Sequence, residues 1–216
     1  MTLPRTLRTH ALPLCGCILL AACAGESEPP SDTADQPDVV SGEAPSAEPA
    51  DAFLANLAGL CGRAFAGTAT FGDTEGFEDL VMHVRECRDG AILIPLHAGE
   101  NRSRTWIVTR TDEGLRLKHD HRLEDGSDDP VTWYGGDTAT PGTPLSQSFP
   151  ADAETAALIP AAATNEWTMT LEPGERFIYH LTRGGAPRAT FEFDLTEEVA
   201  TPPAPWGYET TGSSGR

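Results

Sequence analysis

The sequence carries very little positive charge. Its 216 residues contain one lysine, Lys118, and 15 basic residues in all, against 33 acidic residues, so the formal net charge is -18. This balance excludes nucleic acid as a partner, because a groove that follows phosphates needs a basic face. The hydrophobic content of 39% is also low for a uniformly packed globule of this length. We therefore expect part of the chain to lie outside the core.

Long hydrophobic runs and the common catalytic motifs are also missing. The apolar stretch at residues 11–20 is too short to cross the hydrocarbon layer of a bilayer, about 30 Å thick, as a helix. The motifs Gly-x-Ser-x-Gly, Ser-x-x-Lys and His-Glu-x-x-His do not occur. The sequence therefore gives no support for an enzyme, and we expect no cofactor.

The N-terminal residues have the pattern of a cleavable signal peptide. Two arginines precede the apolar stretch, and the sequence Leu-Ala-Ala-Cys follows it and ends at Cys23. These four residues resemble the lipobox of bacterial lipoproteins. The resemblance implies cleavage after residue 22, lipidation of Cys23 and anchoring in the membrane of the cell envelope, with the following alanine typical of the outer membrane. Ordinary secretion is the alternative, since Ala-Cys-Ala also matches a signal-peptidase site.

Composition divides the rest of the chain into a tether, a domain and a tail. Residues 24–52 contain eight acidic residues and no basic residue, with almost no large apolar side chain, so they cannot bury enough surface to fold. We expect a disordered acidic tether at 23–52 and a domain at 53–200. Residues 201–216 are rich in Pro, Gly and Ser and are expected to form a disordered tail, from which Trp206 and Tyr208 could dock onto the domain.

The domain at 53–200 is predicted to be all-β. Apolar residues from Phe53 to Leu60 recur at helical spacing, so one short N-terminal helix is expected. After it, turn sequences such as Asp-Gly and Gly-Gly recur between segments that alternate in polarity. Short hairpins make neighbouring strands antiparallel, and closure of the sheet removes its edges. We predict a meander of about ten strands closing into a barrel, at 64–71, 77–87, 91–97, 103–111, 114–122, 131–135, 145–149, 165–171, 175–182 and 188–195.

This arrangement resembles the calycin group, which includes the lipocalins, fatty-acid-binding proteins and nitrobindins. The stretch at 60–67 stands where these families often have a Gly-x-Trp motif, but it has no Trp. Nitrobindins bind haem through a histidine of a late strand, and His180 lies in such a strand without a matching motif. The stretches at 102–106 and 117–121 resemble those of uncharacterised bacterial secreted proteins, a family that brings no known activity.

Cysteine is scarce, and its positions are informative. Once the signal peptide and Cys23 are set aside, Cys61 and Cys87 are the two that remain. In an oxidising envelope such a pair is expected to form a disulfide, while two buried free thiols are the alternative.

Two histidines are the candidate metal ligands. His119 and His121 lie two residues apart in an expected strand, so their side chains project from the same face. A metal site would need further ligands from elsewhere in the chain. The alternatives are a pair of pocket histidines, if that face is the barrel interior, or a pair of ordinary surface histidines.

The basic residues gather in one part of the domain. Residues 85–122 contain eight basic and six acidic residues, whereas residues 123–200 are strongly acidic. Such a sector can receive a carboxylate or phosphate, which the planar guanidinium of arginine binds well. The alternative is ion pairing between neighbouring strands. The candidate ligand-binding residues are Arg102, Arg104, Trp106, Arg110, His119 and His121.

These features favour a lipid-anchored envelope protein whose barrel binds a small apolar or amphipathic anion. One alternative is a structural or interaction protein with a solid barrel and an envelope protein as its partner. The other is a metal-binding protein that uses His119 and His121.

Overall fold

The computed structural model describes residues 48–72, 75–88 and 90–209, and the statements below concern these residues. The expected signal peptide, the lipidation site Cys23 and most of the expected tether lie outside them. The elements are α1 (Pro49–Ala58), β1 (Ala64–Gly72), β2 (Leu80–His83), β3 (Glu86–Arg88), β4 (Ala91–Ala98), β5 (Asn101–Thr111), β6 (Gly114–His121), β7 (Tyr134–Asp137), β8 (Ser146–Pro150), α2 (Ala153–Leu158), the 3-10 turn η1 (Pro160–Ala162), β9 (Asn165–Glu172), β10 (Arg176–Arg183) and β11 (Ala186–Asp194).

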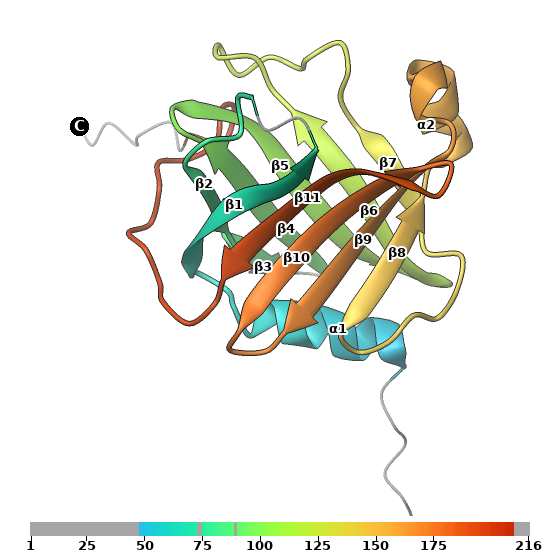
Figure 1. Ribbon diagram of the computed structural model, residues 1–216, viewed down its shortest axis with the longest axis horizontal. Helices are drawn as coiled ribbons and strands as arrows, with labels where there is room; N and C mark the ends of the chain where they lie inside the picture. Colours follow the sequence, from blue (N-terminus) through green and yellow to red (C-terminus); the bar gives the residue numbers. More distant parts are fainter. Residues whose placement is uncertain (1–47, 73–74, 89, 210–216) are drawn as a thin grey trace, which may run out of the picture. The chain divides into compact units, whose positions relative to one another are not determined.

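Ten of the strands follow one another around a nearly closed antiparallel barrel (Figure 1). The order is β7-β6-β5-β4-β2-β1-β11-β10-β9-β8, and the short β3 pairs with β4 at the side. Contacts that include α2 join the two end strands, since Asp152 N donates to Gly135 O at 3.0 Å and Thr155 Oγ1 donates to the same oxygen at 2.8 Å. The prediction of an antiparallel barrel of about ten strands is confirmed.

The N-terminal helix α1 covers one end of the barrel (Figure 1). It begins at Pro49, whose fixed φ suits the first turn of a helix. Phe53 and Leu57, one turn apart, are both completely buried in the core. The helix begins four residues before the expected domain boundary at residue 53, because Ala50 also belongs to its buried face.

The alternation of side chains places the core inside the barrel. Trp167, Met169 and Leu171 are at most 2% exposed, whereas the residues between them are more exposed. Phe191 and Phe193 repeat this pattern on β11. Each strand therefore has one buried face and one face turned outward, as the sequence predicts.

Three local features differ from the sequence prediction. The strand expected at 131–135 begins only at Tyr134, as β7. The expected strand at 77–87 is divided into β2, which pairs with both β1 and β4, and β3, which pairs with β4 alone among the described strands, and the register with β4 shifts by one residue between them. The helix α2 was not expected. Its N-cap is Asp152, whose carboxylate accepts a hydrogen bond from Thr155 N at 2.7 Å.

The C-terminal segment 201–209 packs on the barrel instead of extending as a free tail. Trp206 N donates to Arg102 O at 3.2 Å, and the Arg102 guanidinium donates to Ala204 O at 2.9 Å. The Tyr208 hydroxyl donates to Asp120, a fully buried carboxylate on β6. This docking by Trp206 and Tyr208 fixes the segment against β5 and β6.

A disulfide joins Cys61, just after α1, to Cys87 in β3, with the two Cα atoms 6.2 Å apart. The bridge therefore links the segment after α1 to β3. None of the helices in the described ranges is long and apolar enough to cross a membrane.

Candidate ligand-binding site

A cavity of about 380 Å³ lies inside the barrel, and no residue of α1 lines it. Its volume is within the range of about 300–1,000 Å³ that is typical of small-molecule sites. The lining residues come from seven strands, β4 to β7 and β9 to β11, from η1 and from segments between the elements. Six of them are aromatic, namely Phe77, Trp106, Tyr134, Trp167, Tyr179 and Phe191.

Three of these aromatic rings form a nearly parallel series across the cavity. Trp106 stacks on Tyr179 with ring centroids 4.3 Å apart and an angle of 11° between the planes. Tyr179 in turn lies parallel to Phe191, with centroids 5.7 Å apart and an angle of 10°. Such a wall of large flat surfaces favours contact with an apolar or aromatic ligand.

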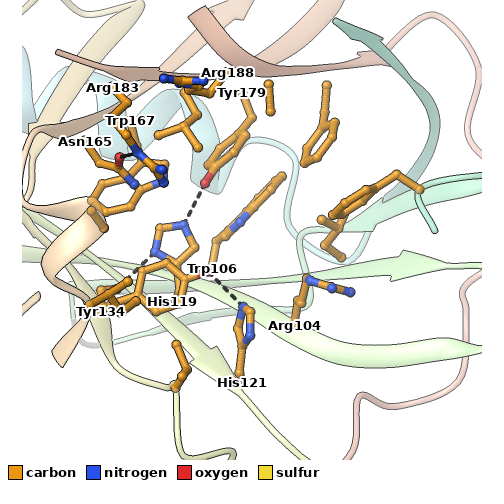
Figure 2. Close-up of a pocket in the computed structure, with 18 residues that line it drawn as sticks. Arg104, Trp106, His119, His121, Tyr134, Asn165, Trp167, Tyr179, Arg183 and Arg188 are labelled. Atoms are coloured by element: carbon orange, nitrogen blue, oxygen red, sulfur yellow. Dashed lines mark hydrogen bonds between the residues drawn. The ribbon is translucent and has the colours of Figure 1, made fainter. Parts of the chain in front are cut away.

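His119 holds two tyrosines of the cavity in place (Figure 2). Its Nδ1 lies 3.0 Å from Tyr134 O, which can only accept, so Nδ1 carries the proton. Nε2 therefore accepts from the Tyr179 hydroxyl at 2.8 Å. Burial lowers the pKa of His119 to about 3, so the ring is neutral at pH 7. Burial also raises the pKa of Tyr134 to about 12 and that of Tyr179 further.

His121 also lines the cavity, where its Nε2 lies 3.1 Å from the Tyr134 hydroxyl. Burial, and next the positive charge of Arg104, lower its pKa to about 4. Both histidines thus face the interior, and both nitrogens of His119 already have hydrogen-bond partners. Within the described ranges, no group of three or more His, Cys, Asp or Glu side chains is placed to hold a metal ion. His180 lies outside the cavity lining and contacts the Thr190 hydroxyl at 2.7 Å.

The cavity is lined by three arginines, Arg104, Arg183 and Arg188, and by no acidic residue of the described chain. Every other basic residue that the structure describes has a carboxylate oxygen within 4.0 Å, whereas these three have none among the described residues. The Arg104 guanidinium lies 5.0 Å from the centre of the Phe77 ring, and its Nη1 is buried with no hydrogen-bond partner in that part of the chain. Arg183 Nε donates to Asn165 Oδ1 at 2.8 Å.

A scan against models of protein families, a search of curated proteins and a search of solved structures each found no match to this chain. The chemistry of the site is therefore argued from its own side chains. An aromatic interior with arginines at its edge is suited to a ligand that is apolar over most of its surface and carries negative charge.

The structure brings together four of the predicted site residues and leaves two outside. Arg104, Trp106, His119 and His121 line the cavity. Arg102 does not, because it lies beyond a register shift between β4 and β5 and contacts the C-terminal segment. Arg110 lies at the other end of β5, where it forms an ion pair with Asp51 of α1 at 2.6 Å. Seven of the eight basic residues of the sector have a carboxylate oxygen within 4.0 Å, and Arg104 is the exception among the described residues. Of these pairs, only that of Arg116 with Asp137 joins neighbouring strands, β6 and β7, as the alternative of ion pairing between strands expects.

Several cavity residues were not identified from the sequence. The alternation of β10 contains the signal for Tyr179, since its neighbours at even spacing, Phe177 and Leu181, are apolar. Arg183 and Arg188 carry no comparable signal, because they flank a hairpin turn in a stretch that is acidic overall. Tyr134, Asn165 and Trp167 are further examples.

Proposed function

We propose that this chain is a lipid-anchored envelope protein whose barrel binds a small apolar or amphipathic anion. The observation that carries the proposal is the cavity lining, which combines six aromatic side chains with three arginines and no acidic residue within the described chain. In a protein with 33 acidic and 15 basic residues, this separation of charge favours an anion inside the barrel.

Arg104 is the residue expected to bind the negative group most strongly. A buried donor without a partner costs about 1–3 kcal/mol, and more when it is charged. Nη1 of Arg104 is such a donor among the described residues, and Phe77 holds the guanidinium in place through its ring face. A carboxylate or phosphate oxygen would supply the missing acceptor.

The proposal is tested by isothermal titration calorimetry with 2-naphthoate and its neutral isostere 2-naphthamide. We expect 2-naphthoate to bind at least about tenfold more tightly, because a hydrogen bond to a charged group contributes about 1.5–3 kcal/mol. Arg104→Gln should remove this preference, since glutamine keeps the polarity but not the charge.

Arg110→Gln is the matched control, because it removes the same charge from the other end of the same strand, outside the cavity. It should leave the affinity for 2-naphthoate unchanged. If neither compound binds, the proposal that the barrel binds a small anion is wrong. An interaction protein with an envelope partner then becomes the favoured hypothesis.

Lipid anchoring rests on the sequence at residues 20–23. We expect the protein, expressed in a bacterial host, to incorporate a labelled fatty acid and to enter the detergent phase in a phase-separation assay. Cys23→Ser should abolish both, because the thiol is the acceptor of the diacylglyceryl group. Cys17→Ser, a change within the expected signal peptide, should have no effect, and an unlabelled but processed protein would instead support ordinary secretion.

A further inference from the structure

The arginines of the cavity lie on opposite walls of the barrel. Arg104 belongs to β5, Arg183 ends β10 and Arg188 lies on β11. In the order of the sheet, four strands separate β5 from β10 in one direction, and four separate them in the other, across the contact of β7 with β8. Figure 2 shows Arg104 on one side of the cavity, with Arg183 and Arg188 on the other.

The two positive groups are Arg104 on one wall and the pair of Arg183 and Arg188 on the other, and contacts on each wall hold them apart. The Arg104 guanidinium lies over the Phe77 ring, at 5.0 Å from its centre. Arg183 is held by the 2.8 Å hydrogen bond from its Nε to Asn165. With strands about 4.8 Å apart and tilted by about 40°, a barrel of ten strands is about 20 Å wide between opposite backbones. The two guanidinium groups therefore enter the cavity from opposite backbones, and these contacts hold each of them at its own wall.

The parallel aromatic rings span the space between the two positive groups. Trp106 lies two residues after Arg104 on β5, while Tyr179 and Phe191 lie on β10 and β11, the strands of Arg183 and Arg188. The contacts from Trp106 to Tyr179 and from Tyr179 to Phe191 therefore connect the two walls through a row of stacked rings, and the parts of these rings that do not cover one another line the cavity. A flat ring system can lie against this surface with either end directed at an arginine.

We infer that the ligand of this cavity is a flat aromatic dianion, with one negative group at Arg104 and the other at Arg183 and Arg188. This inference rests on the proposed binding of an anion and specifies its class. Among the described residues, neither wall has a carboxylate that lines the cavity and balances its arginines. A dianion would supply one negative group to each wall, whereas a ligand with a single negative group would supply only one of them.

The test compares naphthalene-2,6-dicarboxylate with 2-naphthoate by isothermal titration calorimetry at pH 7. The two share one ring system and differ by one carboxylate. We expect the dicarboxylate to bind at least about tenfold more tightly, because its second carboxylate forms additional hydrogen bonds to charged groups. The double variant Arg183→Gln/Arg188→Gln should lose this gain, so that it binds the two compounds with similar affinity. Arg176→Gln, at the other end of β10 and outside the cavity lining, should behave as the parent protein.

The outcomes separate the inference from the proposed function. If 2-naphthoate binds through Arg104 and the dicarboxylate binds no more tightly, the dianion is wrong and the binding function stands. If neither compound binds, both are wrong. The comparison of the two compounds on the parent protein does not depend on the folding of any variant, and circular dichroism shows whether the double variant keeps its strands.

Discussion

The barrel is expected to lose most of its stability as the pH falls from about 6.5 to about 4. Two buried histidines, His97 and His119, and the half-buried His121 cause this loss. The pKa is lowered to about 3 for His119 and to about 4 for His121 and His97. Each of these rings is neutral in the folded protein at pH 7. Protonation at lower pH would place a positive charge on a ring that is removed from water in the folded structure.

The surroundings of the histidines explain the direction of each shift. Burial is the largest cause for all three. His97, on the outward face of β4, also lies near His83, Arg102 and Arg85, whose positive charge opposes its protonation, and its Nε2 has no hydrogen-bond partner in the described chain. His119 has Lys118 and His121 as charged or titratable neighbours, and it accepts a hydrogen bond from Tyr179, which protonation would break.

The direction and size of the change in stability with pH follow from proton linkage. A histidine in the unfolded chain titrates near 6.5, so between that pH and the lower folded pKa the unfolded state binds more protons. Each such histidine then removes about 1.4 kcal/mol of stability for every unit of pH. At pH 4 the three together remove roughly 9 kcal/mol, which is comparable to the whole stability of a typical domain, about 5–15 kcal/mol.

Urea unfolding at pH 7, 6, 5 and 4.5 measures this dependence. His119→Gln cannot titrate, so it should reduce the slope of stability against pH by about 1.4 kcal/mol per unit, even though it lowers stability at pH 7. His97→Gln, on the outward face of β4, should reduce the slope by a similar and independent amount. A stability that stays constant from pH 7 to pH 4.5 would show that these histidines are protonated in the folded protein.

The fold could be predicted from the sequence because the alternation of apolar and polar residues along each strand shows which of its faces is buried. In β9 the large apolar residues occupy every second position, so a shift of one residue would expose Trp167 and bury Glu166. The helix at the end of the barrel follows from the spacing of Phe53 and Leu57. The division of the strand at 77–87 could not be predicted, because it depends on how β1 and β4 pair with each half of it.

The residues of the site could be predicted only in part, because the period of a strand shows the face of a residue but not its partners on other strands. His119, His121 and Trp106 could be placed on a face by the period of a strand, and the structure puts that face inside the barrel. Whether an arginine is neutralised depends on carboxylates across the sheet. The sequence therefore could not separate Arg104 from Arg110, which differ in that one faces the cavity and the other meets Asp51.

Loss of the disulfide between Cys61 and Cys87 is expected to lower the free energy of unfolding by about 3 to 4 kcal/mol, from the entropy that the bridge removes from the unfolded chain. The bridge closes a loop of 26 residues that contains β1 and β2. Cys61 is exposed, so a reductant can reach it in the folded protein. Urea unfolding of Cys61→Ser/Cys87→Ser at pH 7 measures the effect, and unfolding of the parent protein with and without dithiothreitol repeats it without a substitution.

Because the bridge acts mainly on the unfolded chain, its loss should leave the folded cavity intact. Neither Cys61 nor Cys87 lines the cavity, and the double variant should therefore bind 2-naphthoate with the affinity of the parent protein. The variant should also be insensitive to dithiothreitol, which separates loss of the bridge from other effects of the reductant. Equal unfolding midpoints for the parent protein with and without reductant would show that the two cysteines do not form a stabilising bridge in solution.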